Sequence, residues 1–244
     1  MKIVLPLLAA LTSASPVMAQ GLGQSVSVDI GLGAGVRPSY PGSDETKVVP
    51  WLILRNFKNG SGGTQEAQGF SFGPSFNLID RREAGDHDRL NGMDDISRAY
   101  EGGLRLGYTH GPATAYATMR KGFGGHHGVT GEVGAKYRID ATDRFTFWAG
   151  LEAGYGNDRF NDTYFGVTAD EAARTDYAAF APGSGFNSAA ATLEGRFSLT
   201  DNTALLGQLR LGRIIGDAAD SPVVADKSQN SVRLGIVRTL TFGF

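Results

Sequence analysis

VTGEVGAKYRIDATDRFTFWAGLEAGY, residues 129–155, contains two successive runs in which apolar and polar residues alternate. In the first run, Val133 and Tyr137 lie on an apolar parity. Glu132 and Lys136 lie on the opposite parity, with glycine between them. Successive side chains of a strand point to opposite faces of a sheet, so this alternation predicts two strands. The polar residues between the runs predict a short turn, and the stretch is expected to form an antiparallel hairpin.

The same alternation recurs along the chain and predicts ten strands. In chain order, the expected strands are 26–36, 48–55, 70–78, 100–109, 113–120, 129–139, 145–155, 191–199, 205–211 and 232–244. Two of them have weaker patterns and are assigned as strands because their neighbours leave no other partner. The run 48–55 is apolar on both parities and contains Pro50, and the run 113–120 is rich in alanine and also suits a helix. An extra hairpin within 48–65 or 157–183 would raise the number of strands to twelve.

The lengths of the strands and of their connections favour a membrane barrel. Most of the runs reach the roughly nine to eleven residues that a tilted strand needs to cross a bilayer, against about five or six in a soluble sandwich. Short connections alternate with long ones at 79–98, 157–183 and 215–228, and the connection 56–65 is the exception. We therefore expect an all-β fold, a closed antiparallel transmembrane β-barrel of 10–12 strands with long outer loops and short periplasmic turns. A soluble exported β-protein is the alternative.

Charged residues concentrate on the parity opposite the apolar one. We expect them to line the bore of the barrel, because an unpaired charge is costly in a dry core. A barrel of about ten strands is narrow, so opposite charges should pair across it and leave the interior narrow or plugged. The expected bore-lining charges are Asp29, Glu101, Arg105, Glu132, Lys136, Arg138, Glu152, Glu194, Arg196, Arg210 and Arg233.

The first residues have the composition of an export signal. Residues 1–19, MKIVLPLLAALTSASPVMA, combine an early lysine, an apolar stretch and a small-residue cleavage pattern. Cleavage is expected between Ala19 and Gln20, which leaves residues 20–244 as one barrel domain. A buried N-terminal helix is the alternative, although prolines interrupt the stretch and no amphipathic period is present.

The last strand ends in aromatic residues on the lipid-facing parity. Phe242 and Phe244 resemble the C-terminal assembly signal of outer-membrane barrels. Together with the export signal, this pattern indicates the outer membrane of a Gram-negative cell, so the lipid of that membrane is the first expected partner.

Composition and motifs argue against several classes of chemistry. The chain has no Cys, which excludes disulfides and a cysteine nucleophile, and its formal charge of -2 argues against nucleic-acid binding. His126 and His127 are adjacent and would point to opposite faces of an extended segment. Loop 79–98 is acidic but lacks the spacing of a calcium loop. No G-x-S-x-G motif is present, and we expect no enzyme activity, cofactor or metal.

Thr168–Glu171, TADE, fits a capping box, so loop 157–183 is expected to hold one short helix.

Three segments resemble the MipA/OmpV family. They are Gly31–Leu52 (GLGAGVRPSYPGSDETKVVPWL), Asp162–Thr168 (DTYFGVT) and Leu211–Val224 (LGRIIGDAADSPVV). The resemblance implies an outer-membrane β-barrel without enzyme activity. It also implies a scaffolding role, since the namesake joins a murein-degrading lytic transglycosylase to a bifunctional murein synthase on the periplasmic side.

Two functional classes stay open at this point. The first is the murein scaffold, and the second is a surface receptor, an adhesin or a narrow solute channel. A shared fold does not decide between them. The family segments also have a purely structural interpretation, because Tyr40-Pro41-Gly42 suits a turn.

Overall fold

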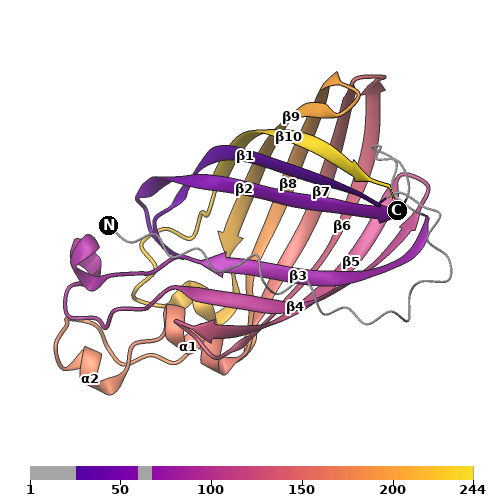
Figure 1. Ribbon diagram of the computed structural model, residues 1–244. Helices are drawn as coiled ribbons and strands as arrows, with labels where there is room; N and C mark the ends of the chain where they lie inside the picture. Colours follow the sequence, from indigo (N-terminus) through magenta and orange to yellow (C-terminus); the bar gives the residue numbers. More distant parts are fainter. Residues whose placement is uncertain (1–25, 60–67, 244) are drawn as a thin grey trace.

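The computed structural model describes residues 26–59 and 68–243, which form one antiparallel sheet of ten strands (Figure 1). All ten expected strands are confirmed, including the two with weak patterns. The last one ends at Phe242, two residues before its expected end. The strands are β1 (Val26–Pro38), β2 (Thr46–Asn59), β3 (Gly69–Ile79), β4 (Ala99–His110), β5 (Ala113–Gly124), β6 (Val129–Thr142), β7 (Phe145–Gly156), β8 (Gly185–Thr200), β9 (Thr203–Ile214) and β10 (Ser231–Phe242).

The order of the strands is that of a β-barrel wall that is interrupted between one pair of neighbouring strands. Neighbours in sequence pair in order from β3 to β10, and β1 pairs with both β10 and β2. The first and last strands therefore meet, with Val26 opposite Phe242. Among the described residues, β2 and β3 do not pair, and they form the two edges of the sheet. The structure thus confirms the antiparallel strands and their order but not the closure of the barrel.

Glycines let β1 and β10 approach closely. Gly33 lies opposite Gly235, and a Cβ placed on Gly33 would collide with the backbone of Leu234 in β10. The alternating glycines of β1 thus have a structural reason, since only a residue without a side chain fits there.

The two faces of the sheet differ in chemistry. One face carries large apolar side chains that stay exposed, and Phe70 is the extreme case at 80%. The other face carries the charged residues and the glycines of β1. This division follows directly from the period of two in the sequence, because neighbouring residues of a strand alternate between the faces.

The connections divide the sheet into a long-loop end and a short-turn end. Figure 1 shows α1 (Asp158–Phe165) and α2 (Ala169–Ala172) at the same end as the β1–β2 connection. The short 3-10 helices η2 (Ala84–Asp86), η3 (Asp88–Leu90) and η4 (Gly216–Asp220) lie in the other long connections. The opposite end has the tight turns at 111–112, 143–144 and 201–202.

The expected short helix in 157–183 is confirmed as α2. The side chain of Thr168 accepts a hydrogen bond from the backbone of Glu171, and Glu171 binds back to Thr168, which is the predicted capping box. The second helix of this connection, α1, was not expected. Asn157 caps it, and its apolar side chains pack on the end of the sheet, which is a tertiary contact that the local pattern does not reveal.

Some predictions lie outside the described residues. They are the export signal at 1–19, the cleavage between Ala19 and Gln20, and the terminal Phe244. No helix within 26–59 and 68–243 is long and apolar enough to cross a membrane.

Candidate functional site

Two ion pairs cross the charged face of the sheet. Arg196 Nη1 of β8 lies 2.9 Å from Asp29 Oδ2 of β1. Arg55 Nη2 of β2 lies 2.5 Å from Glu194 Oε1 of β8. Since β9 and β10 separate β1 from β8, and neighbouring strands are about 4.8 Å apart, such contacts require a concave face. The charges therefore bridge the hollow side of the sheet.

A third pair connects neighbouring parts of the same face. Arg210 Nε lies 2.7 Å from Glu152 Oε1, and the hydroxyl of Tyr116 donates to Glu152 Oε2 at 3.3 Å. The guanidinium of Arg105 stacks on the ring of Tyr116, 3.6 Å from its centroid. These four side chains form one connected network on β4, β5, β7 and β9.

Of the other expected charges, Glu132 lies 3.6 Å from Arg120 Nη2, and three basic residues have aromatic or acidic partners. Lys136 lies 6.0 Å from the ring centroid of Trp148, and Arg233 lies 5.9 Å from that of Trp51. Arg138 pairs with a neighbouring carboxylate, that of Asp140, near the short-turn end. The expected residues thus share one face of the sheet. That this face lines a closed bore stays a prediction.

The concave face is not uniformly polar. Near the short-turn end, Ile53, Ala204, Leu206 and Val237 form a buried apolar cluster, and Trp51 packs against it. The sequence predicts a lining of charged and small residues on this face. Leu206 is a large apolar residue that lies on the inward parity. The cluster packs where β2, β9 and β10 bring apolar side chains together, which no single strand pattern reveals.

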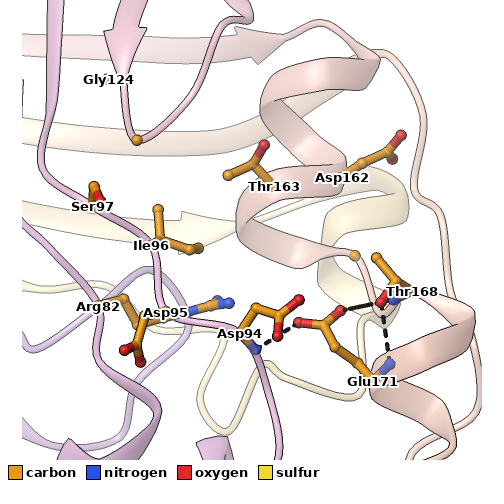
Figure 2. Close-up of a pocket in the computed structure, with 12 residues that line it drawn as sticks. Arg82, Asp94, Asp95, Ile96, Ser97, Gly124, Asp162, Thr163, Thr168 and Glu171 are labelled. Carbon is orange, nitrogen blue, oxygen red and sulfur yellow. Dashed lines mark hydrogen bonds between the residues drawn. The ribbon is translucent and has the colours of Figure 1, made fainter.

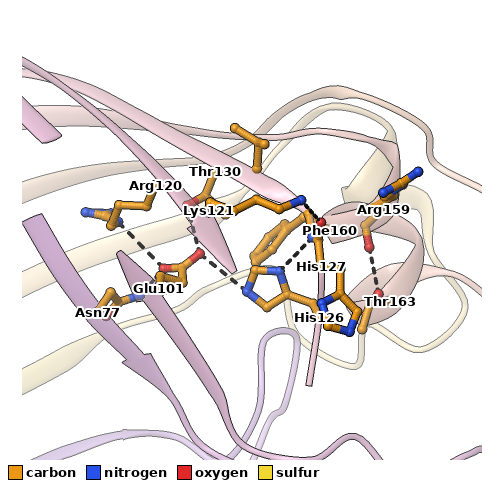
Figure 3. A network of polar contacts seen from close by, with 12 residues as sticks. Asn77, Glu101, Arg120, Lys121, His126, His127, Thr130, Arg159, Phe160 and Thr163 are labelled. Carbon is orange, nitrogen blue, oxygen red and sulfur yellow. Dashed lines mark hydrogen bonds and ion pairs between the residues drawn. The ribbon is translucent and has the colours of Figure 1, made fainter. Parts of the chain in front are cut away.

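Glu101 is the centre of a buried network at the long-loop end (Figure 3). Its side chain is almost completely buried, and its carboxylate accepts hydrogen bonds from Asn77 Nδ2 at 2.6 Å and Thr130 Oγ1 at 2.8 Å. Arg120 Nε lies 3.6 Å away, and His126 Nε2 lies 3.4 Å away. A buried carboxylate with donors on both oxygens is stable as an anion.

His126 connects this network to α1. Its Nδ1 accepts a hydrogen bond from Gly128 N at 3.2 Å, which leaves the proton on Nε2, facing Glu101. The ring packs edge-on against Phe160 and Tyr164 of α1, with centroid distances of 5.0 and 5.6 Å. The ring is buried, its Nδ1 is hydrogen-bonded and its Nε2 faces Glu101, so the geometry suits an anchor for α1 rather than a general base.

The adjacent histidines point apart, as the sequence predicts for neighbours. The side chain of His126 is buried, whereas His127 is exposed and its carbonyl accepts from Lys121 Nζ (Figure 3). In the described ranges, no three His, Asp or Glu side chains are arranged to hold a metal ion.

A cavity of about 300 Å³ lies among the long loops (Figure 2). Residues from the connections 79–98 and 157–183 and from the end of β5 meet around it. The lining includes Arg82, Ser97, Gly124, Thr163, Thr168 and Glu171. The capping box closes one side, since Glu171 also accepts a hydrogen bond from Asp94 N at 2.9 Å.

Arg82 and Tyr164 are two buried side chains beside this cavity with polar atoms that lack a partner. Arg82 Nη1 donates to the carbonyl of Tyr164 at 3.1 Å, while Arg82 Nε and the Tyr164 hydroxyl have no hydrogen-bond partner. Burial lowers the pKa of Arg82, and burial together with the charge of Glu101 raises the pKa of Tyr164. Such a recess can hold a small polar molecule.

Three residues of these networks were not predicted from the sequence. Arg55 and Arg120 lie at the ends of the two weak strands and on the same parity as the expected charges, so a parity count through those strands would have found them. His126 lies in a loop, where no periodicity predicts that its side chain is buried.

Comparison with solved structures finds outer-membrane proteins. An outer-membrane channel from Pseudomonas putida F1 shares 14% identity at a TM-score of 0.44, over 93% of this chain and 100% of that one. OprD of Pseudomonas aeruginosa shares 14% identity at a TM-score of 0.36, over 72% of this chain, which spans 50% of OprD. Neisserial surface protein A shares 11% identity at a TM-score of 0.27, over 90% of this chain and 97% of that one.

A sequence comparison with curated proteins finds no match. The family model described as MltA-interacting protein MipA matches residues 30–240. This range includes nine of the ten strands completely or almost completely, together with all three segments that carry the resemblance. The chain therefore belongs to the MipA family.

Proposed function

We propose that this protein is a non-enzymatic scaffold in the outer membrane of a Gram-negative cell. A closed ten-stranded barrel holds it in the membrane, and its periplasmic side joins a lytic transglycosylase to a bifunctional murein synthase. Membership of a family described as MltA-interacting supports the choice of partner.

The exposed apolar face is the observation that carries the membrane location. Phe70, Phe76 and Val48 are exposed to 75% or more, and similar side chains continue round the whole sheet. A soluble monomer rarely exposes a contiguous apolar patch of this extent, whereas a barrel in lipid requires one.

Closure of the barrel through pairing of β2 with β3 follows from the same location. Hydrocarbon offers no hydrogen-bond partner, so a row of free backbone groups cannot stay at membrane depth. Lys47 of β2 already lies 3.2 Å from Asp80, the residue that follows β3, which supports an approach of the two strands.

The interior supports a scaffold better than a wide channel. Ion pairs bridge the concave face, the apolar cluster around Leu206 covers part of it near the short-turn end, and α1 packs against His126 at the other end. With little free bore, the accessible surfaces are the loops and turns, where binding residues are usually located. In our proposal the short-turn end is periplasmic and binds the murein enzymes.

Site-specific photocrosslinking in cells tests the proposal. A benzophenone amino acid replaces Asp143 or Asp201, exposed in two short turns, and the matched controls replace Asp88 or Asp176, exposed in two long loops. We expect a lytic transglycosylase and a murein synthase to be captured from the turn positions only. Equal capture from the loop positions, or repeated absence of murein enzymes, would contradict the proposal.

A surface receptor or adhesin is the second candidate, favoured by the cavity among the long loops. Ser97 lines this cavity and is exposed, so Ser97→Trp should fill the recess without disturbing the sheet. A receptor would bind components of a glycan and peptide array through this recess and lose them in the variant. Identical array profiles for both proteins would exclude the cavity as a receptor site.

A further inference from the structure

The edges of β2 and β3 define a seam in the wall. The contact between Lys47 and Asp80 bridges it at the long-loop end. At the other end, the Gln68 side chain donates to the carbonyl of Gly111 at 3.2 Å and accepts from its N–H at 2.8 Å, which ties the start of β3 to the β4–β5 turn. Within the described residues, no ladder joins the two strands between these points.

Each edge of the seam carries a proline. Pro50 of β2 lies opposite Ala34 of β1, and Pro74 of β3 lies opposite Leu104 of β4. A proline is tolerated in a strand where its nitrogen points away from the existing ladder. Both prolines therefore direct their nitrogens, which lack a hydrogen, toward the seam.

The prolines would leave gaps in any ladder that closes the seam. The Lys47–Asp80 contact and the shared inner face allow a register with Pro50 opposite Phe76 and Pro74 opposite Leu52, which we adopt. The two prolines are then not opposite each other, so donors are missing at two separate positions. Such a ladder is weaker than an uninterrupted one of equal length.

Apolar surface continues through the seam from one face to the other. Outside, Phe70 and Phe76 of β3 are among the most exposed side chains of the chain. Inside, the half-buried ring of Trp51 on β2 packs against the apolar cluster that contains Ile53. The inner side of β3 is open, since a Cβ placed on Gly73 would meet no atom within 4 Å.

We propose that the seam is a lateral opening through which the acyl chain of a membrane phospholipid enters and binds against Trp51. The inference rests on the membrane location proposed above. Hydrocarbon borders the outer rim, so a lipid chain is the apolar molecule available there, and the inner cluster offers it an apolar surface. The donors missing at the prolines weaken the ladder there, so β2 and β3 part only locally and the acyl chain fills the gap, while the hydrogen bonds beyond the prolines keep the rest of the wall closed.

A disulfide lock provides the first part of the test. The natural chain has no cysteine, so within one molecule two introduced thiols can form a disulfide only with each other. In the seam variant, Leu54→Cys and Phe72→Cys lie opposite each other in the adopted register. In the ladder variant, Leu32→Cys and Leu52→Cys lie opposite each other in β1 and β2, which are already paired. Both variants must show the heat-modifiable gel mobility of a folded barrel.

Fluorescence quenching provides the second part. Trp51 and Trp148 are the two tryptophans, so Trp148→Phe leaves Trp51 as the only reporter. In phosphatidylcholine vesicles with dibrominated acyl chains, we expect quenching of Trp51. Oxidation of the seam variant should abolish the quenching and reduction should restore it. The ladder variant should be quenched equally in both redox states.

An outward reporter separates failure of this inference from failure of the proposed membrane location. Leu52→Trp, in a chain without Trp51 and Trp148, places the indole on the exposed face. If this reporter is quenched while Trp51 in the unlocked protein is not, the lateral opening is wrong. If neither is quenched, the membrane location is wrong as well. Quenching of Trp51 that persists in the locked seam variant, or a seam disulfide that never forms although the ladder disulfide does, would also overturn the inference.

Discussion

At the residue scale, Glu101 shows how a charge is kept inside the wall. Its carboxylate is almost fully buried, and it stays ionised because Asn77 and Thr130 donate to it and because Arg120 is close. Removal of one donor leaves a buried anion short of a partner. The loss is therefore larger than for a surface hydrogen bond.

Asn77→Ala should accordingly destabilise the folded barrel. We expect a loss of about 1.5–3 kcal/mol, the range for hydrogen bonds to charged groups. The measurement is the denaturant midpoint of the refolded protein in detergent micelles. Asn91→Ala, in an exposed loop, is the matched control and should leave the midpoint unchanged. Equal midpoints for both variants would show that the Asn77 bond does not stabilise the barrel.

The contribution of Asp80 to the stability of the fold depends on pH. Burial alone would raise its pKa, but hydrogen bonds from Arg98 and Lys47 outweigh this and lower the pKa to about 2. A folded pKa below the unfolded one means that the stabilisation is present above about pH 4 and is lost as the pH falls toward 2. The pair is partly exposed, so the effect is modest and decreases with salt.

Asp80→Asn should therefore be less stable than the natural protein at pH 7 and equally stable near pH 2. Unfolding midpoints measured across this range at low salt check the prediction. Asp201→Asn, in an exposed turn, should follow the natural protein at every pH. A difference for Asp80→Asn that grows on acidification would have the wrong sign for this account.

At the element scale, α1 is held to the sheet by side chains rather than by its own length. The amide of the buried Asn161 donates to the carbonyls of Gly156 and Gly183, at 3.0 and 2.7 Å, and accepts from Asn187 at 2.8 Å. A helix of eight residues is marginal by itself, so such contacts decide whether it forms.

Asn161→Ala should release the segment 157–183 while the barrel stays folded. We expect faster proteolytic cleavage within this segment and no change in heat-modifiable mobility. Arg159→Ala, exposed on the same helix, should be cleaved at the natural rate. Unchanged cleavage of the Asn161 variant would show that other contacts hold the helix.

At the scale of the whole molecule, the sequence predicts where the strands lie, but it does not predict which side chains meet across the concave face. The period of two is local, so it located the strands with a clear alternation, whereas the weak strand 48–55 was assigned from its neighbours, which left no other partner. Partners across the concave face, such as Asp29 and Arg196, depend on strand order and curvature, which lie beyond any local pattern. The burial of His126 and the seam beside β3 escaped prediction for the same reason.

The bridged interior predicts a protein without discrete conductance in planar bilayers. Glu194→Gln, which removes one charge opposite Arg55, should stay silent because the other ion pairs still bridge the interior and the apolar cluster around Leu206 still narrows it near the short-turn end. Discrete single-channel steps in the natural protein, altered by Glu194→Gln, would favour the solute channel over the scaffold.

The central claim is that the apolar face contacts lipid and the charged face is turned inward. Nitroxide labels on single cysteines at positions 232–237 of β10, in protein reconstituted in vesicles, test it most directly. The account predicts that collisions with oxygen, which concentrates in lipid, peak at the even positions, whose natural side chains are Val232, Leu234 and Ile236. Collisions that peak at the odd positions, or even positions that contact a water-soluble nickel reagent, would contradict it.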